Sequence, residues 1–235
     1  LWKLCTAGKN TGNQKLSRKE DDSCTGRMVT KGSAFRLPID RVFSLKGFGT
    51  VVTGTLLDGS LGLNYDTMLY PRAERVKIRG IQVHGQEVSE AVPGQRVAVN
   101  LPGIGKEQIS RGEILATAGS MEGTMIADVR LQLLKSGQRS LKSGTRVHLY
   151  HGAAELVCKI ILFDRVVLKP GEEAIVQLRM EQVTAMKAGD HFVIRFYSPV
   201  ETIGGGVVLN PNGVKRKKGQ NADAAVRYAC TGKER

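Results

Sequence analysis

Short runs of β-branched residues, separated by Gly, Pro, Asn and Asp, constrain this chain more than any other feature of its sequence. From Phe35 onward these runs recur at intervals typical of an antiparallel barrel, and no window between 35 and 209 keeps an apolar period of about 3.6 residues over several turns. We therefore expect an all-β fold with little helix. The first five predicted strands cover residues 49–57, 68–71, 75–84, 95–101 and 113–117.

The pattern breaks at 118–123 and then restarts, which predicts a linker followed by a second barrel of similar size. The strands expected there cover residues 127–134, 146–150, 156–163, 174–180 and 191–197. The predicted organisation is two consecutive antiparallel β-barrels, at 35–119 and 124–210. Residues 1–34 lack apolar periodicity and are expected to be an irregular lead-in or the remainder of an upstream domain, and residues 211–235 a basic tail or linker.

Several features of the chain indicate an internal fragment of a soluble, cytoplasmic protein with no membrane partner. The sequence begins with Leu1, shows no signal-peptide pattern and has no apolar run near the roughly 18 residues of a membrane helix. Its four cysteines form no Cys-x-x-Cys pair, so neither a zinc site nor a disulfide framework is indicated. His148 and His151, three residues apart in a predicted strand, should face opposite sides and share no metal.

The familiar motifs of catalysis are missing from the sequence. Gly8 and Lys9 are followed by Asn10, so the hydroxyl residue of a phosphate-binding loop is lacking, as is its upstream glycine. The glycines at 204–206 precede no helical pattern, and we interpret them as backbone bends rather than a dinucleotide site. The chain also has no nucleophile elbow and no His-Glu-x-x-His helix. We expect no enzyme activity, catalytic residue, metal or cofactor on this chain.

The formal net charge of +13 suggests an anionic partner, but it is concentrated at the two ends of the chain. Residues 1–34 carry a net charge of +4 and residues 210–235 a net charge of +5, which leaves +4 for the much longer middle. Because basic tails are often solvated, net charge alone does not establish nucleic-acid binding. The case depends on a particular site.

One charged pair, Asp40 and Arg41, interrupts an otherwise apolar strand pattern in the segment 37–54, LPIDRVFSLKGFGTVVTG. This segment resembles the second domain of translational GTPases of the elongation factor Tu superfamily, and ISRGEILA at 109–116 is similar to the closing-strand motif of that superfamily. The resemblance covers about 35–212. It implies that both predicted domains are barrels of the kinds that form the second and third domains of those proteins.

Three departures from the elongation factor Tu pattern are similar to the selenocysteine-specific elongation factors. Asp40 and Arg41 stand where the pattern has Glu-Asp. Phe48 stands between two glycines where the pattern has Arg. At residues 94–96, Gly-Gln-Arg replaces the Gly-Glu-Asn of the pattern, so that Arg96 stands in place of Asn. The segments 81–84 and 197–206 fit the same branch. The resemblance implies that Asp40, Arg41 and Arg96 line the pocket for the aminoacyl group of selenocysteinyl-tRNA.

The chemistry of these three residues suits that ligand. A thiol has a reference pKa of about 8.5 and a selenol is more acidic, so selenocysteine is largely anionic at neutral pH whereas serine is not. Arg41 and Arg96 would favour the selenolate over the hydroxyl of the seryl precursor carried by the same tRNA. Asp40 would receive the α-amino group or orient Arg41. Neighbours on a regular strand face opposite sides, so a shared pocket requires an irregularity, which Pro38 makes credible.

The resemblance also implies the partners of the longer protein. GTP and magnesium would bind an upstream domain, the ribosome would receive the tRNA, and a messenger hairpin would bind C-terminal domains that this chain lacks. The second barrel should support the acceptor arm through phosphate contacts, for which Arg139, Lys142, Arg146 and Lys159 are unranked candidates. Three alternatives stand: a rim ion pair without function, the barrel pair of another translational GTPase with a different charged tRNA, and a protein-interaction module.

Overall fold

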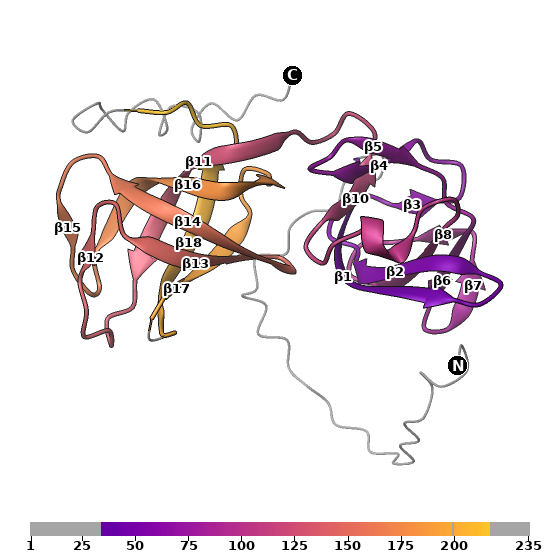
Figure 1. The fold of residues 1–235 in the computed structure, drawn as a ribbon, viewed down its shortest axis with the longest axis horizontal. Coiled ribbons are helices and arrows are strands. Elements are labelled where there is room, and N and C mark those ends of the chain that lie inside the picture. The colour runs from indigo at the N-terminus through magenta and orange to yellow at the C-terminus, as the bar shows by residue number, and fades with distance from the viewer. Residues whose placement is uncertain (1–33, 199, 217–235) are drawn as a thin grey trace, which may run out of the picture.

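The computed structural model describes residues 34–198 and 200–216, and these form two all-β domains joined in tandem (Figure 1). The predicted fold class is therefore confirmed. The predicted lead-in lies outside the described residues apart from Ala34, as does the predicted tail beyond residue 216. Among the described residues, no helix has the length and apolar character needed to cross a membrane.

The first domain is one curved sheet of eight strands, paired in the order β5-β4-β10-β1-β2-β9-β6-β7, together with the small β3–β8 pair. A short 3-10 helix, η2 (Lys106–Gln108), precedes the last strand. The strands are β1 (Arg36–Leu45), β2 (Gly49–Thr55), β3 (Leu61–Gly62), β4 (Thr67–Tyr70), β5 (Glu74–Val76), β6 (Gly80–Val83), β7 (Gln86–Val88), β8 (Glu90–Ala91), β9 (Arg96–Leu101) and β10 (Ile114–Thr117).

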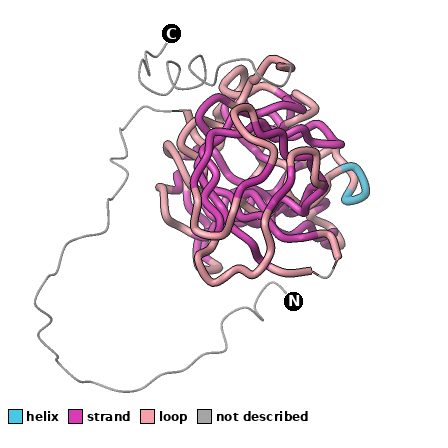
Figure 2. The backbone as a smooth tube through the Cα atoms, turned by 90° about the vertical axis from the view of Figure 1, so that its left-hand side faces the viewer, coloured by secondary structure: helices cyan, strands magenta, loops and turns pink. Residues whose placement is uncertain are grey.

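The second domain is a closed barrel in which β11-β16-β14-β13-β17-β18 form the wall, with β12 and β15 paired beside it. Figure 2 views the molecule from the side of this domain and shows the strands arranged around a central axis. The strands are β11 (Gly123–Leu133), β12 (Leu141–Lys142), β13 (Arg146–His151), β14 (Ala154–Leu162), β15 (Val167–Leu168), β16 (Glu173–Ala185), β17 (His191–Phe196) and β18 (Thr202–Asn210).

Alternation of buried and less buried residues explains how each sheet encloses its core. In β14, for example, Leu156, Cys158 and Ile160 are buried while the residues between them are more exposed, as a strand with one core face requires. Apolar side chains of this kind form one large cluster inside each domain. Burial raises the pKa of the Cys158 thiol to about 12, so this cysteine carries no reactive thiolate at neutral pH.

Two predicted features differ in detail from the structure. The expected strand 75–84 is divided, because the chain turns at 77–79 so that β5 pairs with β4 whereas β6 pairs with β9. The glycines at 204–206, interpreted from the sequence as backbone bends, lie within β18 and permit close packing against the neighbouring strands. A Cβ on Gly206 would collide with the carbonyl oxygen of Arg130 on the neighbouring strand.

The two domains meet at a buried ionic cluster. Arg36, only 1% exposed, donates hydrogen bonds to Asp58 in its own domain at 2.9 Å and to Asp190 in the second domain at 2.6 Å. His151 Nε2 lies 2.9 Å from the same oxygen of Asp190. Close packing accompanies this cluster, because a Cβ on Gly112 would lie 2.6 Å from the Cα of Ala154. These contacts fix how the two barrels sit against each other.

Candidate functional site

Asp40 lies at an irregularity in the pairing of β1 with β2. Ile39 is opposite Gly54 and Arg41 is opposite Thr53, so Asp40 is the extra residue of a β-bulge. A Cβ on Gly54 would collide with the carbonyl oxygen of Pro38, which shows that the glycine lets the two strands approach closely at this point. The irregularity that the adjacent charged pair requires is therefore present beside Pro38.

The bulge directs Asp40 toward Arg96 on β9. Arg96 donates two parallel hydrogen bonds to the Asp40 carboxylate, from Nη1 to Oδ2 at 2.6 Å and from Nη2 to Oδ1 at 2.9 Å. Thr53 Oγ1 donates a third at 2.9 Å to Oδ1. The Asp40 side chain is 26% exposed and that of Arg96 52% exposed, so the pair is open to a ligand from solvent. A half-exposed pair of this kind adds only about 0.2–1 kcal/mol to stability.

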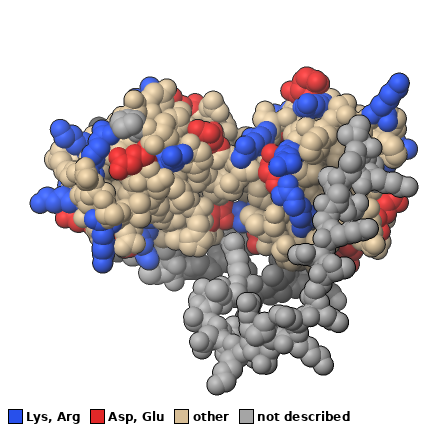
Figure 3. Space-filling model, turned by 90° about the horizontal axis from the view of Figure 1, so that it is seen from below, with Lys and Arg blue, Asp and Glu red and all other residues tan. Residues whose placement is uncertain are grey.

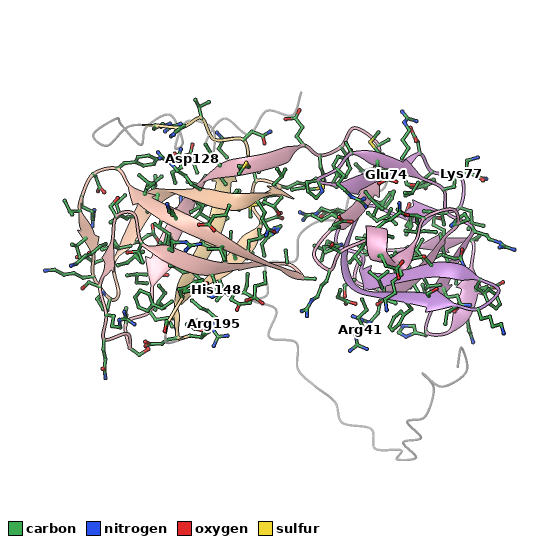
Figure 4. The ribbon with its side chains drawn as sticks, in the orientation of Figure 1. Arg41, Glu74, Lys77, Asp128, His148 and Arg195 are labelled. Atoms are coloured by element: carbon green, nitrogen blue, oxygen red, sulfur yellow. The ribbon has the colours of Figure 1, made fainter. Side chains whose placement is uncertain are left out.

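Arg41 is not tied to the other two predicted residues. It is exposed, and within the described parts of the chain no hydrogen bond or ion pair of its side chain is found. Asp40 thus orients Arg96 rather than Arg41, which differs from the hydrogen bond we expected. In Figure 4, Arg41 extends from the lower side of the first domain. The structure brings together Asp40 and Arg96 and leaves Arg41 as a separate exposed cation on the adjacent residue.

A second polar surface, on β13 and β17 of the second domain, combines aromatic rings with arginines. His148 stacks on Tyr197 with ring centroids 4.9 Å apart and an angle of 6° between the planes. The Arg146 guanidinium lies 5.4 Å from the Tyr197 ring, and that of Arg195 lies 5.8 Å from the ring of Tyr150. Such rings and guanidiniums are the groups that proteins use to contact nucleic acids. We call these five residues the aromatic platform.

Sequence reasoning ranked none of the platform residues, although a signal was present. Arg146, His148 and Tyr150 alternate along β13, so they occupy one outer face, and Arg195 lies on β17 two residues before Tyr197, which follows the end of that strand. Of the other basic residues named from sequence, Lys159 lies opposite Arg146 on the next strand and Arg139 stacks on Phe196 at 4.1 Å. Lys142 lies on the separate strand β12.

The histidines behave as the strand period predicts. His148 belongs to the outer platform, whereas His151 is buried at the domain interface, so they share no site. At that interface burial alone would raise the pKa of Asp190, but hydrogen bonds from His151 and Arg36 hold it well below its ordinary value. Asp190 is therefore a permanently charged structural group at neutral pH and not a proton donor.

Arg41 and the aromatic platform lie on the same side of the molecule. Arg41 in the first domain and His148 and Arg195 in the second all appear along the lower side in Figure 4. Figure 3 views this side and shows Lys and Arg side chains on both domains, with Asp and Glu side chains between some of them. An elongated anionic partner could touch both surfaces at once.

Comparisons with known families match one domain each. Residues 49–116 match the family model described as elongation factor Tu domain 2, and residues 128–215 match the beta-barrel domain of the selenocysteine-specific elongation factor. Among curated proteins, the Selenocysteine-specific elongation factor of Desulfomicrobium baculatum is 39% identical over 206 residues, covering 87% of this chain and 32% of that protein.

Two further relatives come from the two branches of elongation factors that the sequence resembles. The Selenocysteine-specific elongation factor of Escherichia coli is 30% identical over 76% of this chain and 28% of its own length. Elongation factor Tu 2 of Streptomyces avermitilis is 27% identical over 74% of this chain and 45% of its own length. The chain thus spans about a third of the length of the selenocysteine-specific relatives, and the two family models match its first and second domains, of which the second is described as a beta-barrel domain.

Proposed function

Since the chain carries the two β-barrel domains of a selenocysteine-specific elongation factor, we propose that it binds the charged end and acceptor arm of selenocysteinyl-tRNA, as part of a longer delivery factor. The observation that carries this proposal is the bidentate pair of Asp40 and Arg96 at a bulge beside the exposed Arg41. These residues distinguish the barrel from the elongation factor Tu pattern. They also supply the charges that a selenolate and an α-amino group require.

Asp40 keeps capacity for one more donor. A carboxylate offers about four acceptor positions. Thr53 and the two Arg96 nitrogens occupy three of them. The remaining position would accept the α-ammonium of the aminoacyl ester. Arg96, held in place by Asp40, and Arg41, free to turn toward the ligand, would then face the selenolate. A serine hydroxyl would meet the same two cations without a charge to offset their desolvation.

The aromatic platform would support the acceptor arm. Double-stranded RNA is contacted mainly through its phosphates and 2′-hydroxyls, and Arg146 and Arg195 provide donors on exposed strands while His148 and Tyr197 provide a flat surface. The common side shared by the platform and Arg41 supports a single ligand that reaches both domains. In the longer, cytoplasmic protein, GTP and magnesium would bind an upstream domain and the ribosome would receive the tRNA.

The test is the selectivity of Arg96→Ala. Protection of the aminoacyl ester against hydrolysis should weaken about tenfold for selenocysteinyl-tRNA, because a charge-assisted contact to an anion contributes roughly 1.4 kcal/mol. Protection of seryl-tRNA should change much less. Arg75→Ala is the matched control, because Arg75 is an exposed arginine of the same domain whose Nη1 donates to both carboxylate oxygens of Asp66. Equal losses for the two tRNAs in the Arg96 variant would contradict the proposal.

Salt dependence separates this function from a protein-interaction module. Binding through phosphates releases counterions, so the affinity for charged tRNA should fall steeply as salt rises. A module that recognises a protein through its apolar surface would show little such dependence. An affinity for tRNA that stays flat with salt would favour the module.

A further inference from the structure

The six residues after β18, 211–216, cross the outer wall of the second barrel as a docked strap. Gly213 N donates to the Ile126 carbonyl at 2.9 Å, Gln177 Nε2 to the Val214 carbonyl at 3.0 Å, and Arg179 Nη2 to the Arg216 carbonyl at 2.6 Å. Asp128 and Gln177 alternate with core residues and so belong to the outer face, yet both are 0% exposed. The strap is therefore what buries them.

A cleft of about 720 Å³ lies between this strap and the barrel wall. Its charged side chains are all basic, and the remaining lining is small or apolar. The lining residues are Ser143, Gly144, Ile161, Val166, Arg179, Lys215 and Arg216. Asp128 beneath the strap lies on the upper side of the second domain in Figure 4, opposite the side of His148 and Arg195. The cleft shares no lining residue with the aromatic platform, although Lys159 lies between Arg179 of the cleft and Arg146 of the platform on neighbouring strands.

The cations of the cleft have donors without acceptors. Arg216 Nη2 lies 3.1 Å from Asp128 Oδ2 without hydrogen-bond geometry, and the buried Arg216 Nη1 has no hydrogen-bond partner among the described residues. Arg179 donates only to neutral oxygens, of Gln177 and Arg216, and forms no ion pair with an acid in the described parts of the chain. Buried donors are normally satisfied, so Arg216 Nη1 has capacity for a further acceptor at this site.

Electrostatic repulsion among the cations around the cleft also indicates that an anion binds there. Lys159 is directly opposite Arg179 on the neighbouring strand, and like charges at such positions are destabilising. Asp128 balances one positive charge, that of Arg216, and no ion pair joins Arg179, Lys215 or Lys159 to an acid among the described residues. A compact anion with several acceptor oxygens would satisfy the free donors and relieve the repulsion together.

We propose that the cleft between the strap and β16 binds a phosphate group, through Lys215, Arg216 and Arg179. This site is distinct from the aminoacyl pocket and goes beyond the proposed function. A phosphate group would come from an RNA backbone or from a free phosphate compound, and both present the same oxygens to the guanidiniums and the ammonium.

The experiment titrates the chain and its Lys215→Gln variant with two probes, inorganic phosphate and a short RNA duplex. Lys215 is the residue to change because its side chain forms no hydrogen bond or ion pair with the described residues, so the strap does not depend on its charge. Loss of one charged contact should weaken phosphate binding about fivefold. Lys215→Arg should restore it. Lys77→Gln, which removes the same charge from the first domain, should bind like the unchanged chain.

The two probes identify the source of the phosphate. A backbone ligand predicts that Lys215→Gln also weakens duplex binding about fivefold and that inorganic phosphate competes with the duplex. A free phosphate compound predicts that only the inorganic phosphate titration changes. If Lys215→Gln and Lys77→Gln behave alike with both probes, the site does not exist. The preference for selenocysteinyl-tRNA over seryl-tRNA should be unchanged in Lys215→Gln, so failure of this proposal is distinguishable from failure of the proposed function.

Discussion

At the scale of single residues, the proposed aminoacyl pocket depends on a glycine as much as on its charges. Gly54 has no room for a side chain, because the carbonyl oxygen of Pro38 occupies the space that a Cβ would take. This close approach accompanies the bulge at Asp40, and the bulge lets Asp40 meet Arg96. The charged residues therefore have their geometry only while the neighbouring backbone stays tightly paired.

Gly54→Ala should destabilise the first domain by about 1–3 kcal/mol, the usual cost of forcing extra atoms into a packed site. Gly80→Ala is the matched control, because it is also a strand glycine but has open space where its Cβ would lie. Thermal or urea unfolding of the two variants measures the difference. Equal stabilities would show that the backbone at Gly54 relaxes without difficulty.

The sequence predicted the three residues of the proposed pocket but not how their side chains pair. Asp40 and Arg41 were noticed because they interrupt an apolar run, and strand period then required an irregularity between them. That Asp40 bonds to Arg96 depends on the register of β1 against β2 and of β2 against β9, which no local pattern determines. The family resemblance predicted that Asp40, Arg41 and Arg96 act together. In the structure, Asp40 and Arg96 form a hydrogen-bonded pair, and Arg41 stays apart.

At the scale of strands, the outer face of the second barrel carries two chemically different surfaces. β13 and β17 present the aromatic platform, whereas β16 and the strap enclose the basic cleft. Both arise from the same period of two, because inner positions form the core and outer positions remain free to vary. The alternation of apolar and polar residues along each strand thus predicted the strands of the barrel well. It did not reveal that Asp128 and Gln177, polar outer residues, would be buried by residues 211–216.

Arg195→Gln should weaken tRNA binding and reduce the slope of log affinity against log salt by about one, the change expected when one phosphate contact is lost. Arg130→Gln is the control, because Arg130 is an exposed arginine on β11 of the same barrel. Fluorescence anisotropy at several salt concentrations provides both quantities. A slope that does not change in Arg195→Gln would mean that this residue contacts no phosphate.

At the scale of the whole molecule, one buried arginine holds the two barrels together. Arg36 occupies a strand of apolar character and gave no signal in the sequence, because its partner Asp190 lies 154 residues further along the chain. Breaking a buried ion pair by removing one partner leaves an uncompensated charge, which costs several kcal/mol. The relative position of the domains is therefore sensitive to this single contact.

Asp190→Asn should lower the free energy of unfolding by about 3 kcal/mol and separate one calorimetric transition into two. The effect depends on pH. Because the pKa of Asp190 is lower in the folded protein than in the unfolded chain, its stabilisation is full above the ordinary carboxyl pKa of about 3.9 and is lost as the pH falls below it. The unchanged chain should therefore lose more stability than the variant over that range. Parallel pH profiles would contradict this role.

The close contact between Gly112 and Ala154 restricts movement between the two domains. Together with the hydrogen bond between Arg36 and Asp190, this contact packs the two domains tightly against each other. The proposed pocket on the first domain and the platform on the second are therefore held at a fixed spacing. A rigid pair of domains of this kind would select a bound RNA helix by its length. Under the proposed function, an RNA helix would reach the proposed pocket with its end and rest on the platform with its side only if its length matches that spacing, and a shorter or longer helix would engage one surface alone.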